Sequence, residues 1–150
     1  LVEEPGIRAL VVDSPYARVS DLLSGETTRK TGIPEWLSPI FIPAAKIMAG
    51  LFYGIDIGSL VPEEAVRQLA YPIFVIHGKE DTRIPYTHGE RVYDAAYQES
   101  TIVQDGTLIT YQGSTIWLIP GVGHVDAFLD YPEEYVLRVT EYFMGQLGID

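Results

Sequence analysis

The sequence predicts an α/β protein of three layers, in which a partial parallel sheet of three strands is flanked by helices and carries one β-hairpin insertion. Three apolar runs rich in β-branched residues, 8–13, 73–77 and 115–119, have the unbroken hydrophobicity of strands that are buried on both faces. Helical patterns separate the runs, which favours right-handed crossovers between parallel strands. An Asp-Gly pair between two β-prone arms predicts the hairpin.

The first strand, 8–13, ends at an Asp-Ser-Pro turn signal. The stretch that follows at 33–57 is apolar and punctuated by prolines, and its spacing is helical over 44–52. We interpret this stretch as a helical excursion between two strands. A helix at 62–69 comes next, because a proline suits the first helical turn and the two acids beside it complement the helix dipole.

The second strand, 73–77, precedes a predicted helix at 85–98, in which Val92, Ala95 and Ala96 share one face. The chain then enters the predicted hairpin at 101–111. Its central Asp105-Gly106 is typical of a type I′ turn, and we interpret the hairpin as a surface insertion.

The third strand, 115–119, is followed by an amphipathic helix at 132–147, which ends among glycines.

The chain has 150 residues, which suits a single domain. Its formal net charge of −11 repels phosphate backbones, so we expect no nucleic-acid partner. The absence of cysteine excludes disulfides and thiol nucleophiles.

Membrane and targeting signals are weak in this sequence. The most apolar stretch, 40–57, is interrupted by proline, glycine and charged residues and does not have the pattern of a membrane span. The first residues lack the basic region of a signal peptide, and we expect them to belong to the interior of a longer protein. The absence of cysteine does not fix the compartment; we slightly favour a cytoplasmic location and leave an upstream signal or anchor open.

Two strand-end loops each present one ionisable side chain. Asp81 follows the second strand, and His124 follows the third after the closely spaced Gly121 and Gly123. Because the carboxyl ends of neighbouring parallel strands meet at one edge of a sheet, we expect the two side chains to meet there. A carboxylate in that place fixes the tautomer of an imidazole, which can then move a proton to and from a nucleophile.

Simpler roles exist for each of these groups. Asp81 could be a helix cap or an Asx turn, Glu80 is a competing acid, and His124 could be a satisfied loop histidine. We expect His77 to be a packed or hydrogen-bonded histidine and His88 to lie on the surface of the 85–98 helix. The sequence has no short His-x-x-x-His pair, so we expect neither a metal nor a cofactor.

A nucleophile is missing from this pattern. No serine lies in a Gly-x-Ser-x-Gly frame; the serines are Ser14, Ser20, Ser24, Ser38, Ser59, Ser100 and Ser114. Ser14 lies at a strand end, but Pro15 follows it. Proline lacks the N–H that the residue after the nucleophile contributes to an oxyanion hole, so Ser14 is a poor candidate.

The two loops resemble those of bacterial serine hydrolases related to the prolyl-oligopeptidase and dienelactone-hydrolase groups. Residues 72–85 are similar to the acid loop "P-hydrophobic-H-G-x-x-D-x-x-(V/I)-P", and residues 118–124 are similar to the histidine loop "G-x-G-H". Residues 8–16 look like the sixth strand of that fold. The resemblance implies that 1–150 is the C-terminal portion of a single α/β-hydrolase domain, with Asp81 as triad acid and His124 as triad base.

The resemblance also implies that the nucleophilic serine and the oxyanion donors lie upstream of residue 1. It places a lid at 33–57. The aromatic and apolar side chains of that segment would line a substrate pocket or, equally, pack in the core. These residues are Trp36, Phe41, Met48, Phe52 and Tyr53.

We therefore expect the C-terminal part of a serine hydrolase that cleaves ester, amide or peptide bonds of a small-molecule or peptide substrate through an acyl-enzyme. This chain alone should be inactive, and its partner is the N-terminal half of the same protein. The alternative is a non-catalytic α/β interaction module that retains the fold. The unpaired edge of strand Arg8–Asp13 also predicts self-association, because exposed edges recruit further strands.

Overall fold

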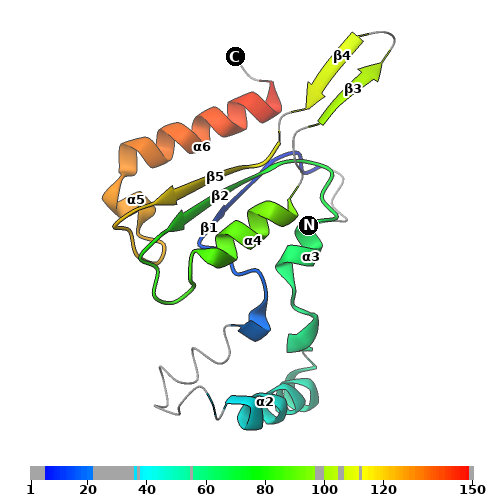
Figure 1. The fold of residues 1–150 in the computed structure, drawn as a ribbon, viewed down its shortest axis with the longest axis vertical. Helices are drawn as coiled ribbons and strands as arrows, with labels where there is room; N and C mark the ends of the chain where they lie inside the picture. Colours follow the sequence, from blue (N-terminus) through cyan, green and yellow to red (C-terminus); the bar gives the residue numbers. More distant parts are fainter. Residues whose placement is uncertain are drawn as a thin grey trace.

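The sheet of the computed structural model has the predicted parallel topology (Figure 1). The structure describes residues 6–21, 36, 38–54, 56–96, 100–104, 107–111 and 113–148. Strands β1 (Leu10–Asp13), β2 (Ile73–Gly78) and β5 (Thr115–Ile119) lie parallel in the order β1-β2-β5. The register pairs Asp13 with Ile76 and Gly78 with Ile119, so all three strands end at the same edge.

The central strand β2 is buried along its whole length, which explains its continuous apolar sequence. Side chains alternate across a strand, so Ile73 and Val75 join one core and Phe74 and Ile76 join the other. The two flanking strands differ from the prediction of full burial. β1 is half-buried, and β5 is half-buried or exposed except at Ile119, because each has one sheet neighbour among the described residues.

Helices α3 (Pro62–Val66) and α4 (Thr87–Ala95) cover one face of the sheet. The core on this side consists of Ala17, Val66, Leu69, Ile73, Val75, Val92 and Ala96. Val92, Ala95 and Ala96 are buried, as their shared helical face predicts. Both helices are shorter than the predicted 62–69 and 85–98.

The opposite face is covered by the short helix α5 (Ala127–Asp130) and by α6 (Pro132–Leu147), which has the predicted bounds (Figure 1). Tyr142 of α6 packs against Phe74 with ring centroids 5.5 Å apart, and its hydroxyl donates to the carbonyl of Pro72 at 2.7 Å. Burial raises the pKa of Tyr142 to about 12. Gly148 ends α6 in the left-handed conformation, with φ 64°, a common C-terminal signal.

The predicted hairpin is present as a second, two-stranded sheet. Strands β3 (Ser100–Gln104) and β4 (Thr107–Tyr111) pair antiparallel from Ser100–Tyr111 to Gln104–Thr107. Figure 1 shows the pair projecting from the main sheet. Residues 105–106, on which the predicted turn type depends, lie outside the described part of the chain.

The predicted helical excursion contains α2 (Ser38–Tyr53), and the 3₁₀ turn η2 (Ile57–Ser59) begins at its last residue. α2 starts before the predicted 44–52 and continues through Pro43. It lies at the end of the molecule opposite the β3–β4 hairpin (Figure 1). None of the described helices has both the length and the apolarity that a membrane crossing requires.

A neck formed by segments 17–21 and 60–63 joins the excursion to the sheet. Val19 N–H donates to Leu60 O at 3.2 Å, and Glu63 N–H donates to Ala17 O at 3.1 Å. Hydrogen bonds between these two segments therefore bring the described chain before the excursion and the chain after it together beside α3.

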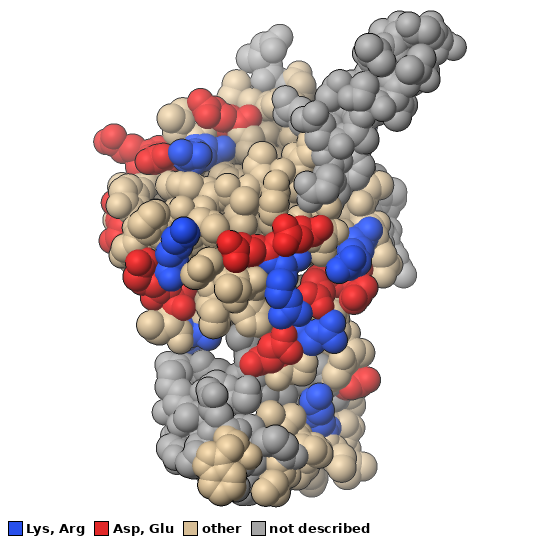
Figure 2. Space-filling view, in the orientation of Figure 1, with Lys and Arg blue, Asp and Glu red and all other residues tan. Residues whose placement is uncertain are grey.

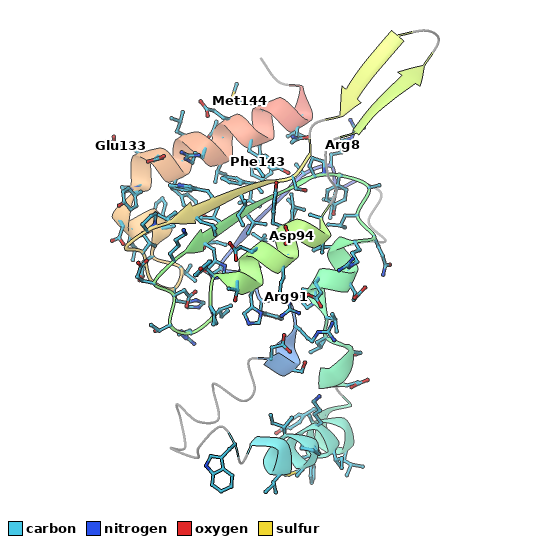
Figure 3. The ribbon with its side chains drawn as sticks, in the orientation of Figure 1. Arg8, Arg91, Asp94, Glu133, Phe143 and Met144 are labelled. Atoms are coloured by element: carbon cyan, nitrogen blue, oxygen red, sulfur yellow. The ribbon has the colours of Figure 1, made fainter. Side chains whose placement is uncertain are left out.

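Ion pairs reinforce this neck. The buried Glu63 accepts from Arg18 at 2.6 Å and from Arg91 of α4 at 2.7 Å, and Arg91 also contacts Asp21 at 2.7 Å. Figure 2 shows basic and acidic side chains interleaved on this face, and Figure 3 shows Arg91 on α4. Hydrogen bonds from Arg18, and then from Arg91, outweigh burial and hold the pKa of Glu63 below its usual value.

Candidate active site

The loops that follow β2 and β5 are in close backbone contact. Lys79 N–H donates to Ile119 O at 2.9 Å, and Glu80 N–H donates to Val122 O at 3.0 Å. A Cβ on Gly78 would press directly against the carbonyl oxygen of Val122. Glycine at position 78 thus permits the approach that brings the acid loop to the histidine loop.

Asp81 and His124 are in hydrogen-bond contact, as their strand-end positions predict. His124 Nδ1 lies 2.7 Å from Asp81 Oδ2. The Asp81 side chain is 0% exposed and that of His124 is 24% exposed. An ionised carboxylate can only accept, so the imidazole carries a proton on Nδ1, and Nε2 is the nitrogen that can accept a further proton.

The second oxygen of Asp81 is held by the backbone. Asp81 Oδ1 accepts from the N–H groups of Arg83 and Ile84, each at 2.8 Å, which is an Asx turn. The turn and the histidine contact therefore coexist, and Asp81 is not the cap of α4, which begins at Thr87 after Tyr86. Burial raises the pKa of Asp81, but the hydrogen bonds from Ile84, His124 and Arg83 together hold it below the usual value.

His77 lies behind the acid. Its side chain is fully buried, and its Nε2–H donates to Ile84 O at 2.9 Å while lying 3.4 Å from Asp81 Oδ2. The prediction of a hydrogen-bonded, packed histidine is confirmed. Nδ1 of His77 faces Gly89 of α4, where a Cβ would lie 2.5 Å away. The sequence contains no local signal for this contact, because it joins two elements through tertiary packing.

Ser14 directly follows β1, and its hydroxyl makes two hydrogen bonds. Its Oγ donates to Asp13 Oδ1 at 3.1 Å and accepts from Val125 N–H at 3.3 Å. Tyr135 donates to Asp13 Oδ2 at 3.3 Å. Burial raises the pKa of Asp13, while the hydrogen bonds from Ser14 and Tyr135 lower it by less.

Two other ionisable residues lie outside this cluster. Glu80 Oε2 accepts from the N–H of Gly121 at 2.7 Å, so the competing acid supports the loop before His124. His88 is buried at 7% exposure, and the prediction that it lies on the surface is wrong. It shares the inward face of α4, where Ala17 N–H donates to its Nδ1 at 3.3 Å. Burial and the charge of Arg91 hold the pKa of His88 below its usual value.

The predicted substrate-binding residues lie in or beside α2, which Figure 1 shows apart from the ends of β2 and β5. They are exposed, at 75% for Trp36, 57% for Met48, 73% for Phe52 and 78% for Tyr53. The side chain of Phe41 is outside the described part of the chain. The four described side chains are therefore not core residues of this chain, and the structure does not place them beside the pair.

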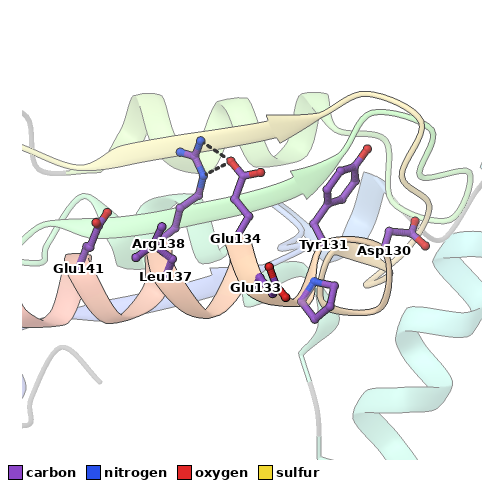
Figure 4. Close-up of a pocket in the computed structure, with 8 residues that line it drawn as sticks. Asp130, Tyr131, Glu133, Glu134, Leu137, Arg138 and Glu141 are labelled. Atoms are coloured by element: carbon purple, nitrogen blue, oxygen red, sulfur yellow. Dashed lines mark hydrogen bonds and ion pairs between the residues drawn. The ribbon is translucent and has the colours of Figure 1, made fainter.

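A cavity of about 720 Å³ lies along the first half of α6, between Asp130 and Glu141 (Figure 4). Glu134 and Arg138 form an ion pair of 2.7 Å there, and neither Asp81 nor His124 lines the cavity. The described residues contain no cluster of three or more His, Asp or Glu side chains that could hold a metal ion.

Several solved structures have folds similar to that of this chain. The Pyrococcus furiosus esterase Pf2001 superposes with a TM-score of 0.63 at 20% identity, over 98% of this chain and 47% of that one. The Pyrococcus horikoshii acylaminoacyl peptidase gives 0.55 at 16% identity, over 100% and 22%. The α/β hydrolase MGS-M2, from a deep-sea metagenome, gives 0.53 at 13% identity, over 95% and 58%. The chain therefore has the α/β-hydrolase fold that the sequence predicts.

Among curated proteins, the chain is similar to the uncharacterized protein YfhR of Escherichia coli K12. The two are 24% identical over 148 residues, which is 97% of this chain and 39% of YfhR. The chain thus spans well under half of the length of the curated relatives it matches. No protein-family model matches the chain.

Proposed function

We propose that the chain supplies the acid and the base of a serine-hydrolase triad in a protein that cleaves ester, amide or peptide bonds. One observation carries the proposal: the 2.7 Å contact between His124 Nδ1 and Asp81 Oδ2, at the carboxyl edge of a sheet with the α/β-hydrolase fold. The buried and doubly hydrogen-bonded carboxylate of Asp81 can hold the imidazole in one orientation while the ring gains and loses a proton.

In this mechanism, Nε2 of His124 takes the proton from a serine hydroxyl as the oxygen attacks the carbonyl carbon. Asp81 stabilises the imidazolium that forms. The imidazolium then gives the proton to the leaving oxygen or nitrogen, and an acyl-enzyme remains. Water repeats the sequence, so that the acid product leaves and the serine regains its proton.

The proposal places the nucleophile and the oxyanion donors upstream of residue 1, with 1–150 as the C-terminal portion of the hydrolase domain. The lengths of the relatives support this, since the chain covers 47% of the Pf2001 esterase and 39% of YfhR. A Gly-x-Ser-x-Gly motif should then lie within about 30 residues before Leu1, the length of one βαβ unit. If the natural protein has no such motif, the non-catalytic module is the better account.

A fluorophosphonate probe tests the activity directly, because it reacts with activated serines. The natural full-length protein should be labelled, and its His124→Ala variant should be labelled about 10⁴-fold or more slowly. The variant Glu64→Gln is the control, since Glu64 is an exposed residue of α3 whose ion pair is with Arg67. Failure of the wild-type protein to react would refute the proposed function.

We also propose that 33–57 is a lid whose apolar side chains contact the substrate. The 73% exposure of Phe52 on α2 supports this role, because so large an apolar surface gains from a partner. Phe52→Ser should raise the KM for esters with long acyl chains and leave the labelling by a small fluorophosphonate unchanged. An unchanged KM across acyl lengths would remove α2 from the substrate site.

A further inference from the structure

Two non-glycine residues with left-handed backbone conformation contact each other beside His124. Ser14 has φ 49° and Val125 has φ 61°, and among the described residues these are the two non-glycine positions of that kind. The N–H of Val125 donates to Oγ of Ser14 at 3.3 Å, across 111 positions of sequence. A left-handed backbone costs free energy for side chains with a Cβ, above all for a β-branched one, so the surrounding contacts must hold both residues in place.

Hydrogen bonds of its backbone N–H and of its hydroxyl hold Ser14 in place. Its N–H donates to Ile76 O of the central strand at 2.9 Å, and its hydroxyl donates to Asp13 Oδ1 at 3.1 Å. The other oxygen of Asp13 accepts from Tyr135 of α6 at 3.3 Å. With its proton directed to Asp13, the Ser14 hydroxyl presents a lone pair to the amide of Val125.

We propose that Ser14 is a positioning residue of the hydrolase site, which fixes the backbone after His124 so that the imidazole stays against Asp81. This inference rests on the proposed function. Val125 directly follows the histidine, so the Ser14–Val125 hydrogen bond holds the backbone after His124. The Glu80–Gly121 hydrogen bond holds the backbone before His124. The loop is thus anchored on both sides of the residue that moves the proton.

The position of Ser14 speaks against its acting as the nucleophile. Its Oγ is engaged with Asp13 and Val125, the residue is 5% exposed, and Pro15 offers no N–H to an oxyanion. A positioning role also accounts for the strain. If the turn at Ser14 served only to change the chain direction, a glycine at position 14 would adopt the left-handed conformation without strain.

The test uses Ser14→Gly and Ser14→Ala in the natural full-length protein. Glycine removes the hydroxyl and relieves the strained φ, so this variant should be at least as stable as the alanine variant. Both should react with the fluorophosphonate about 10- to 100-fold more slowly than wild type, because small displacements of catalytic groups have effects of that size. Ser114→Ala is the matched control. It removes another buried hydroxyl, one that accepts from Ile73 N–H at 3.0 Å at the opposite end of β2.

Ser114→Ala should lower the melting temperature and keep the labelling rate of wild type. Labelling of Ser14→Gly at the wild-type rate would overturn the proposal, and so would a probe adduct that mass spectrometry maps to Ser14. A second readout does not depend on activity: the NMR signal of the Nδ1 proton of His124, which its bond to Asp81 shifts downfield. We expect this signal to broaden or move upfield in Ser14→Gly.

The two readouts separate the two proposals. If the wild-type protein does not react with the probe, the proposed function fails and the Nδ1 signal alone decides the role of Ser14. In that case, an unchanged signal in Ser14→Gly overturns the positioning role, whereas a broadened or shifted signal supports it. A signal that changes equally in Ser114→Ala reports a general loss of structure and also overturns it.

Discussion

A Cβ at position 89 would lie 2.5 Å from Nδ1 of His77, so Gly89 is the residue that lets α4 pass directly over this imidazole. The contact matters because Nε2 of the same ring lies 3.4 Å from Asp81 Oδ2. A helix on one face of the sheet and the acid at its carboxyl edge are therefore connected through one buried side chain.

Gly89→Ala should force His77 to move and should destabilise the fold by about 1–3 kcal/mol, as overpacking of a core does. The matched control is Gly50→Ala in α2, where a Cβ would meet nothing within 4 Å. That control should be neutral or stabilising by about 0.5–1 kcal/mol, because alanine is the better helix former. Urea unfolding measures both, and equal effects of the two substitutions would contradict the packing described for His77.

The ionised carboxylate of Asp81 should stabilise the folded protein, and this contribution should be lost at acidic pH. Its pKa lies below the usual 3.8 in the folded protein, so its contribution is fully present above that value and is lost as pH falls through the folded-state pKa. The stability difference between wild type and Asp81→Asn should therefore shrink as the solution is acidified below about pH 4. A difference that stayed constant from neutral pH down to pH 2 would show that the carboxylate is not held in its ionised form.

The neck of the excursion gives a third prediction. Glu63→Gln removes the charge that Arg18 and Arg91 share, and it should cost roughly 1–3 kcal/mol because Glu63 is buried. Glu64→Gln is a close control on the next residue of α3, whose contact with Arg67 is 3.7 Å long and exposed. It should cost less than about 0.5 kcal/mol. If denaturant midpoints show the two variants to be equal, the neck does not depend on its ion pairs.

The outer edge of β1 gives a fourth prediction, which concerns the chain as an isolated piece. β1 pairs with β2 on one side, and no described strand pairs with its other side. Unpaired edges recruit strands from other molecules, so the isolated chain should self-associate or aggregate. A clean monomer in light scattering at micromolar concentration would refute this.

Local sequence patterns predicted most of the main sheet and its helices. The strands followed from apolar runs, α6 followed from its periodicity between a proline and a glycine, and the hairpin followed from one Asp-Gly pair. The contact between Asp81 and His124 was also predictable, because parallel strands bring their carboxyl ends to one edge.

The remaining features of the site depend on contacts between distant segments. The bond of Ser14 to Val125 and the packing of His77 on Gly89 join elements that no local pattern relates. The burial of His88 is different, because 88, 92 and 96 are spaced at one turn of helix and the apolar face could have been extended to it. Partial burial of β5 depends on its position at the edge of the described sheet, which a strand's own sequence does not reveal.

The most direct test of the Asp81–His124 pair is a double-mutant cycle on the rate of fluorophosphonate labelling of the natural full-length protein. Residues that act as one unit are strongly non-additive, so Asp81→Ala and His124→Ala should each slow labelling by about 10⁴-fold or more, and the double variant should be little slower than His124→Ala. Additive effects of the two substitutions, or labelling of either single variant at the wild-type rate, would contradict the account.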